Sequence, residues 1–133
     1  MFKLLEHPAD VRVKVTGRSL EELFLSASQA LISLLKPVKQ EPAGKTVLKL
    51  KASSIEELLV RFLGELIYLV EVHQKIPAEA TAKIKKKSAL YHLEATIELV
   101  RGQASREIKA ATYHGLKVVQ ERGRYSCFII FDV

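Results

Sequence analysis

The stretch Val11-Arg-Val-Lys-Val15, followed by Ser19-Leu-Glu-Glu22, specifies the first structural unit of the chain. Valines alternate with charged residues in the first part, which predicts a strand with one buried face. The second part matches a capping box, in which the Ser19 hydroxyl accepts a hydrogen bond from the third helical amide. Pro37 bounds the predicted helix at its far end. The apolar positions of that helix recur at helical spacing: Leu20, Leu23, Phe24, Ala27, Leu31, Leu34 and Leu35.

A second unit with the same order of elements follows. Leu48-Lys-Leu-Lys51 alternates as a strand, and Ser54-Ile-Glu-Glu57 repeats the capping box. Pro77 bounds the second predicted helix on its far side. The broad apolar face of this helix consists of Ile55, Leu58, Leu59, Phe62, Leu63, Leu66, Leu69 and Val70.

The rest of the chain predicts two β-hairpins. Ala82–Lys87 and Leu90–Val100 form the first, and a loop is expected at Arg101–Ser105. Ile108–Glu121 and Tyr125–Asp132 form the second, and the glycine of its Arg122-Gly123 turn supplies a positive φ.

These elements together predict the fold class. Cys127–Phe131 is apolar on both faces, so we expect a central strand covered on both sides. Two helices and about six strands, mostly antiparallel, predict an α+β fold with both helices packed on one face of one sheet. We expect residues 1–133 to form a single domain, because no linker or low-complexity segment divides them.

Composition excludes several classes of protein. The 133 residues are 48% hydrophobic, enough for a core, yet no uncharged apolar run approaches the roughly 18 residues of a membrane span. The first residues lack the features of a signal peptide. Cys127 is the only cysteine, which rules out an intrachain disulfide and a cysteine-based zinc cluster. We therefore expect a cytoplasmic protein with no membrane partner.

The net charge of +6 includes one crowded lysine segment. Lys83, Lys85, Lys86 and Lys87 could contact a phosphate backbone or an acidic protein partner. A lysine-rich hairpin exposed to solvent is the alternative. Aromatic and basic residues are not regularly interleaved, so no stacking platform for single-stranded RNA is indicated.

Acidic residues near the two ends of the sequence indicate a metal site. If the first and last strands are neighbours, Asp10, Asp132 and the carboxylate of Val133 converge. Clustered carboxylates repel one another unless a cation lies between them, and oxygen ligands favour Ca²⁺, Mg²⁺ or Mn²⁺. The alternative is that Asp10 caps a turn after Pro8 and Asp132 is simply exposed.

Three further residues are candidates for the same site. His7 and His114 could act as ligands or general bases, or could be ordinary hydrogen-bonded histidines. Lys109 could neutralise the aspartates or contact phosphate, or could be a surface lysine. No phosphate-binding glycine loop or G-x-S-x-G motif occurs, and Cys127 in a buried strand is a poor nucleophile.

Four motifs in this order resemble the archease family along nearly the whole chain. They are His7-Pro8-Ala9-Asp10, Phe62-Leu-Gly-Glu-Leu-Ile-Tyr68, Glu107-Ile-Lys-Ala-Ala-Thr-Tyr-His-Gly-Leu116 and Asp132-Val133. Two positions depart from the family pattern: Pro8 replaces a Thr, and Gly64 replaces an Asn.

The resemblance implies an accessory protein rather than an enzyme. Archeases assist the GTP-dependent tRNA-splicing RNA ligase, promoting its guanylylation and repeated turnover. Some are described as chaperones or specificity modulators of a tRNA methyltransferase. The family's metal site maps onto Asp10, Asp132 and the Val133 carboxylate, with Lys109 nearby. A metal-dependent hydrolase, and direct tRNA binding through the segment 83–87, remain alternatives.

Overall fold

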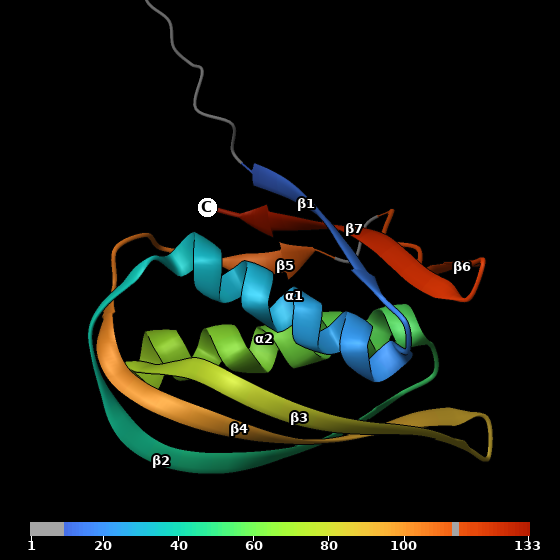
Figure 1. Ribbon diagram of the computed structural model, residues 1–133, viewed down its shortest axis with the longest axis horizontal. Helices are drawn as coiled ribbons and strands as arrows, with labels where there is room; N and C mark the ends of the chain where they lie inside the picture. The colour runs from blue at the N-terminus through green and yellow to red at the C-terminus, as the bar shows by residue number, and fades with distance from the viewer. Residues whose placement is uncertain (1–9, 113–114) are drawn as a thin grey trace, which may run out of the picture.

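Two helices and seven strands make up the part of the chain that the computed structural model describes, residues 10–112 and 115–133 (Figure 1). The helices are α1 (Leu20–Leu35) and α2 (Ile55–His73). The strands are β1 (Asp10–Gly17), β2 (Pro37–Ala52), β3 (Lys75–Lys87), β4 (Leu90–Ala104), β5 (Ala110–Thr112), β6 (Val119–Glu121) and β7 (Arg124–Asp132). No helix among the described residues is long and apolar enough to cross a membrane.

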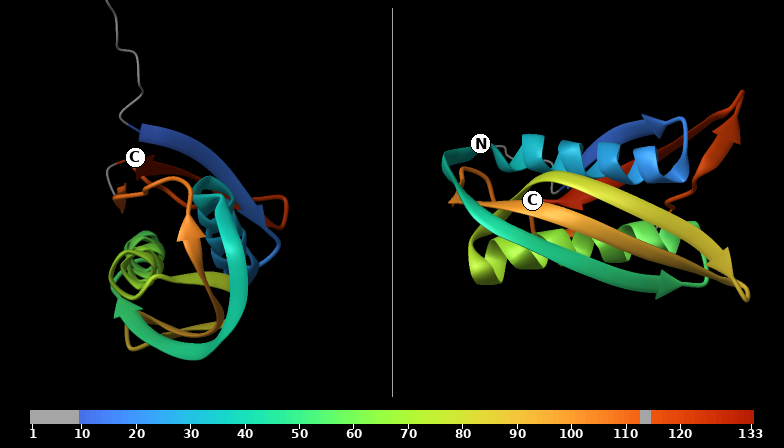
Figure 2. Two further views of the ribbon diagram at one scale, coloured as in Figure 1. Left: turned by 90° about the vertical axis from the view of Figure 1, so that its left-hand side faces the viewer. Right: turned by 60° about the horizontal axis from the view of Figure 1, so that its bottom comes forward.

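The α+β class and the antiparallel pairing are confirmed, but the strands form two sheets rather than one. One sheet has the order β1-β7-β5, with β6 also pairing to β7, and the other has the order β2-β4-β3. Both helices contact both sheets and lie between them (Figures 1 and 2). The prediction of helices on one face of a single sheet was therefore wrong. Alternation shows which face of a strand is buried, but not which strands pair.

The second sheet is built from longer strands than predicted. Leu48–Lys51 is only the last part of β2, which pairs with β4 from Pro37↔Ala104 to Ala52↔Tyr91. Most of the loop expected after Val100 is therefore strand. Register shifts interrupt the pairing on both sides of Pro42, which an edge strand tolerates because its outer amides need no ladder partner.

The first hairpin is confirmed as β3 and β4, whereas the second is only partly as predicted. Arg122 (φ 52°) and Gly123 (φ 74°) form its turn, with positive φ at both central residues as in a type I′ turn. The expected strand Ile108–Glu121 is instead two short strands. Of these, β5 pairs with the end of β7 near Asp132, and β6 pairs with its beginning.

The last strand, β7, is central in its sheet as predicted, but only one of its faces is buried. Cys127, Ile129 and Phe131 face the core, whereas Phe128 is 45% exposed. The Arg12 guanidinium lies 4.2 Å from the centre of the Phe128 ring. A basic side chain thus partly covers the outer face, where we expected a second apolar layer.

Both predicted helix starts are confirmed. The Ser19 hydroxyl accepts a hydrogen bond from the Glu22 amide at 3.1 Å, and the Ser54 hydroxyl accepts one from the Glu57 amide at 3.1 Å. Each hydroxyl satisfies an amide that has no partner within the helix.

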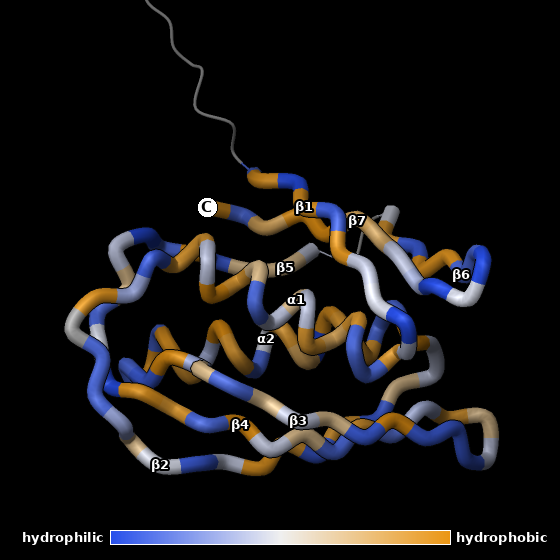
Figure 3. The backbone as a smooth tube through the Cα atoms, in the orientation of Figure 1, coloured by the Kyte–Doolittle hydropathy of each residue, from blue (hydrophilic) through white to orange (hydrophobic). Residues whose placement is uncertain are grey.

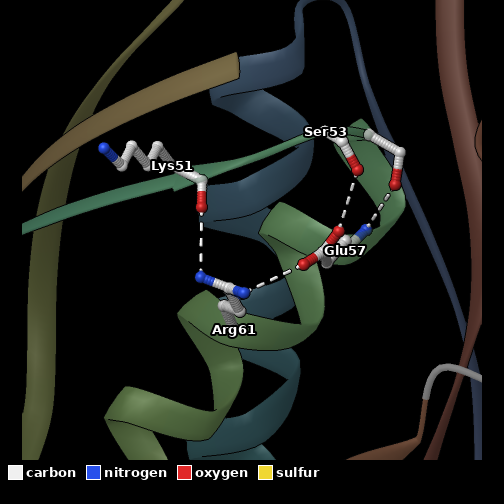
Figure 4. Close-up of polar contacts among 5 residues, drawn as sticks. Lys51, Ser53, Glu57 and Arg61 are labelled. Atoms are coloured by element: carbon white, nitrogen blue, oxygen red, sulfur yellow. Dashed lines mark hydrogen bonds and ion pairs between the residues drawn. The ribbon is translucent and has the colours of Figure 1, made fainter. Parts of the chain in front are cut away.

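Side chains also tie the start of α2 to the end of β2. The Ser53 hydroxyl donates to the Glu57 carboxylate, which pairs with Arg61 at 3.0 Å (Figure 4). Arg61 donates in turn to the carbonyl of Lys51. This chain of contacts fixes the direction in which the helix leaves the strand.

The core lies where the helices meet the inner faces of the sheets. The Phe24 and Phe62 rings, one from each helix, pack with their centres 5.7 Å apart. Hydrophobic and hydrophilic residues alternate along β4 (Figure 3). Four alternate residues of this strand are buried: Leu93, Ala95, Ile97 and Leu99.

Candidate metal centre

Asp10 and Asp132 occupy directly opposite positions in the antiparallel ladder of β1 and β7. This confirms the prediction that the first and last strands are neighbours. Opposite residues project from the same face of a sheet, with Cβ atoms about 4.5–5.5 Å apart. Both residues are exposed. Two carboxylates at this spacing can reach a shared ion, since Ca–O distances are about 2.3–2.6 Å.

The electrostatics of the pair are unfavourable without a counter-charge. Like charges directly opposite in a ladder destabilise a sheet. Among residues 10–112 and 115–133, neither aspartate forms an ion pair with a basic side chain. Arg12 projects from the same face of β1, but its guanidinium lies over Phe128. The carboxylates are thus an open, hard-oxygen donor pair.

Lys109 is adjacent to the aspartates through its backbone. Its amide donates a 2.8 Å hydrogen bond to the Asp132 carbonyl, and Ala110 is the ladder partner of Asp132. The Lys109 side chain is exposed. The motif that begins at Glu107 thus lies against the last strand. This position agrees with the prediction that Lys109 belongs to the same site as Asp132.

Val133 is the other predicted ligand that lies within the described residues. Val133 follows Asp132 directly and is half-buried, packing against the core. The role of its carboxylate as a ligand stays a prediction. His7 and His114 lie outside the described residues. Within the described residues, no group of three or more His, Cys, Asp or Glu side chains is placed to hold a metal.

Two cationic side chains near the aspartates were not predicted as site residues. Arg12 and Lys14 both approach the exposed Phe128 ring, the second at 5.9 Å. They alternate with the less exposed positions of β1 and so share the face that carries Asp10. The alternation of apolar and charged residues in β1 could have shown that Arg12 and Lys14 share a face with Asp10. That Phe128 lies opposite Lys14 is known only from the pairing register of β1 and β7.

Cys127 is not available as a nucleophile. Its side chain is buried, and burial, with a smaller effect from the Glu56 carboxylate, raises the pKa of the Cys127 thiol to about 11. The Glu56 carboxylate itself accepts a hydrogen bond from the Val118 amide at 3.0 Å. At neutral pH the thiol therefore stays protonated, as predicted for a buried strand position.

The predicted lysine cluster divides between two faces of the β3–β4 hairpin. Lys83 and Lys85 line a hollow on the outer face of the β2-β4-β3 sheet, together with Lys49 and Lys51 of β2. Lys86 points the other way, with its ammonium 5.4 Å from the centre of the Tyr91 ring. The two β2 lysines were missed because nothing in the sequence shows that their strand is a neighbour of β4.

Comparisons with known proteins agree on one family. The Archease protein family (MTH1598/TM1083) matches residues 2–133. The archease of Pyrococcus furiosus is 27% identical over 96% of this chain and 95% of its own length. The archease of Methanosarcina barkeri is 28% identical over 99% of this chain and 95% of its own length.

Solved structures match in fold as well. The solution structure of protein 1598 from Methanobacterium thermoautotrophicum has a TM-score of 0.80 at 23% identity, covering 97% of this chain and 96% of that protein. The crystal structure of an archease from Thermotoga maritima, described as a possible chaperone, has a TM-score of 0.74 at 25% identity. It covers 100% of this chain and 98% of that one.

Proposed function

The chain belongs to the archease family, and we propose that it serves as a non-catalytic activator of the GTP-dependent tRNA-splicing RNA ligase. The observation that supports this best is the opposed pair Asp10 and Asp132. Two exposed carboxylates without a basic partner in the described residues suit a site that binds a cation and presents it to another molecule.

The donor set of the pair fits a hard divalent cation. Asp10 and Asp132 would hold Ca²⁺, Mn²⁺ or Mg²⁺, with the Val133 carboxylate as a third ligand and water completing the shell. A bound cation would offset the repulsion of the carboxylates and supply a positive centre for phosphate oxygens. In this proposal Lys109, whose backbone amide bonds to the Asp132 carbonyl, contributes a positive charge at the edge of the site. His7 and His114 are proposed as partner contacts.

A role through a partner also suits the chemistry of the described side chains. Covalent catalysis needs an activated nucleophile, and the Cys127 thiol has a raised pKa and is buried. The carboxylates lie at the rim of a sheet rather than in an enclosed pocket that excludes water. Assistance to another enzyme therefore accounts for this geometry better than hydrolysis by the chain itself.

A second candidate is chaperone action on a tRNA methyltransferase. The description of the Thermotoga maritima relative as a possible chaperone supports chaperone action alone, and the methyltransferase as its target is only what the family resemblance implies. The two functions make different demands on the aspartates. Ligase activation requires the carboxylate pair, whereas a chaperone surface would tolerate its neutralisation.

The decisive experiment is multiple-turnover RNA joining with purified ligase, GTP and Mn²⁺. The Asp10→Asn, Asp132→Asn variant should lose stimulation of ligase guanylylation and of repeated joining. Glu71→Gln, Glu121→Gln, which neutralises two exposed carboxylates on α2 and β6, is the matched control and should stimulate as the wild type does. Full stimulation by the folded double variant would refute the proposed function.

A further inference from the structure

We propose that the outer face of the β2-β4-β3 sheet binds the phosphate backbone of RNA without regard to base sequence. The binding surface, here called the lysine face, consists of Lys49, Lys51, Lys83 and Lys85. The choice of RNA over DNA rests on the proposed function, whereas the choice of a polyphosphate chain rests on the surface itself.

The register aligns these lysines in two rows that cross the sheet. Each row holds a lysine from β2, a residue of the central strand β4 and a lysine from β3. The rows are Lys49, Glu94 and Lys83, followed by Lys51, His92 and Lys85. Adjacent strands are about 4.8 Å apart, so the two lysines of a row are roughly 10 Å apart at the backbone. All six residues line one hollow of about 450 Å³.

The charge of the hollow is strongly one-sided. Four lysines line it, and Glu94 is the single carboxylate among the lining residues. In the described part of the chain, none of these lysines forms an ion pair. Four unpaired ammonium groups around one concave surface concentrate positive potential and attract a polyanion.

The chemistry of the hollow favours phosphate over a protein partner. Protein interfaces are enriched in aromatic residues, Met and Arg and are depleted in Lys. The hollow has no such anchor, and its two leucines, Leu50 and Leu93, pack against the core. Lysine binds phosphate as a point charge. Because no Phe, Tyr or Trp side chain lines the hollow and its one ring is that of the half-buried His92, contacts to the phosphate backbone would carry most of the affinity.

The lysine face is separate from the aspartate pair. The two sites lie on different sheets, on opposite sides of the helices that pack between those sheets (Figure 1). RNA bound on the lysine face would therefore leave Asp10 and Asp132 free for another partner. The two sites can also be inactivated independently.

The hairpin provides a matched control for the test. Lys85 and Lys86 are adjacent in sequence, but the second lies over Tyr91 on the opposite face of the strand. Lys117 is exposed and does not line the hollow. The pair Lys51→Gln, Lys85→Gln and the pair Lys86→Gln, Lys117→Gln therefore remove the same charge from different surfaces.

The test is fluorescence anisotropy with the purified chain, no ligase, EDTA present, and two labelled probes: oligouridine and an RNA duplex of mixed sequence. We expect both probes to bind. Neutralising all four lysines should weaken binding about 10-fold or more and reduce the slope of log affinity against log salt by about 3, near 0.7 per lysine for single strands. The pair on the lysine face should weaken binding more than the control pair does.

Several results would overturn the proposal. These are no RNA binding, equal losses for the two lysine pairs, an unchanged salt slope, or binding to polyglutamate or phosphatidylserine vesicles in place of RNA. Asp10→Asn, Asp132→Asn should keep its RNA affinity while losing ligase stimulation. Failure of the proposed function would instead appear as stimulation that survives in this variant, whatever the RNA affinity.

Discussion

Asp10 and Asp132 face each other across the β1–β7 ladder, the first residue of one strand opposite the last residue of the other. Their separation in sequence spans almost the whole chain, so only the completed fold brings them together. The pair should therefore cost stability when it lacks a cation, and under the proposed function it would become a ligand set when a cation binds. The same two residues link folding to the proposed function.

We predict that Asp10→Asn changes stability in opposite senses with and without divalent cations. In EDTA the substitution removes like-charge repulsion and should raise the free energy of unfolding by about 0.2–1 kcal/mol. With millimolar Ca²⁺ or Mn²⁺, the wild type should gain in Tm and the variant should not, because ligand binding to the native state alone is stabilising. Thermal unfolding followed by circular dichroism measures both. If neither Ca²⁺ nor Mn²⁺ changes the Tm of the wild type, the proposed metal site is wrong.

Two phenylalanines of β7 should differ sharply in their contribution to stability. Phe131 is fully buried, so Phe131→Ala should cost about 3–5 kcal/mol through lost burial and a residual cavity. Phe128 is exposed on the other face and contacts Arg12, so Phe128→Ala should cost about 1 kcal/mol or less. Urea unfolding measures both. Similar losses would mean that the outer face of β7 is covered after all.

The structures at the ends of helices and strands were largely predictable from the sequence. Both serine N-caps and the Arg122-Gly123 turn were predictable, because a few neighbouring residues determine such structures. The proximity of Asp10 and Asp132 was also predictable, from strand ends and from the family resemblance. These signals are local, or they concern only one pair of strands.

The division into two sheets and the lysine face required more than local signals. The pairing of β2 with β4 places Lys49 opposite Glu94, across a long separation in sequence. The alternation of apolar and polar residues showed which face of each strand is buried. It did not show which strands pair, because the period of two is the same in every strand. The expectation that both faces of β7 are covered came from the continuous apolar run Cys127–Phe131, which could not show that the Arg12 side chain lies over Phe128 on the outer face.

Two glycines should respond in opposite ways to alanine. At Gly17 an added Cβ would lie 2.4 Å from the Leu23 amide nitrogen, a backbone atom that cannot rotate aside. Gly17→Ala should therefore cost about 1–3 kcal/mol by overpacking where β1 meets α1. At Gly64, exposed within α2, the space is open, and alanine should stabilise the helix by up to about 1 kcal/mol. Chemical denaturation of both variants tests the pair, and a stabilised Gly17→Ala would show that this approach of strand and helix is loose.

The Cys127 thiol should react slowly and only at high pH. Burial, with a smaller effect from Glu56, raises its pKa from an ordinary value of 9.0 to about 11. Each pKa unit is tenfold in thiolate, so at pH 8 the folded chain should have about 100-fold less thiolate than the urea-unfolded chain. Iodoacetamide labelling followed by mass spectrometry gives both rates. Equal rates in the folded and unfolded states would place the thiol at the surface.

The same raised pKa predicts a loss of stability in alkali. Below pH 9 the thiol is protonated in both states, and its contribution is complete. Between about pH 9 and 11 the unfolded chain releases the proton while the folded chain retains it. The free energy of unfolding should therefore fall by up to roughly 1.4 kcal/mol per pH unit from this group alone.

Cys127→Ala lacks this ionisation and should show a shallower decline over the same window, although its stability at neutral pH is lower. Urea unfolding of both proteins from pH 7 to 11 isolates the contribution of Cys127, since the two proteins differ at this residue alone. Parallel declines would mean that the Cys127 environment does not favour the protonated thiol.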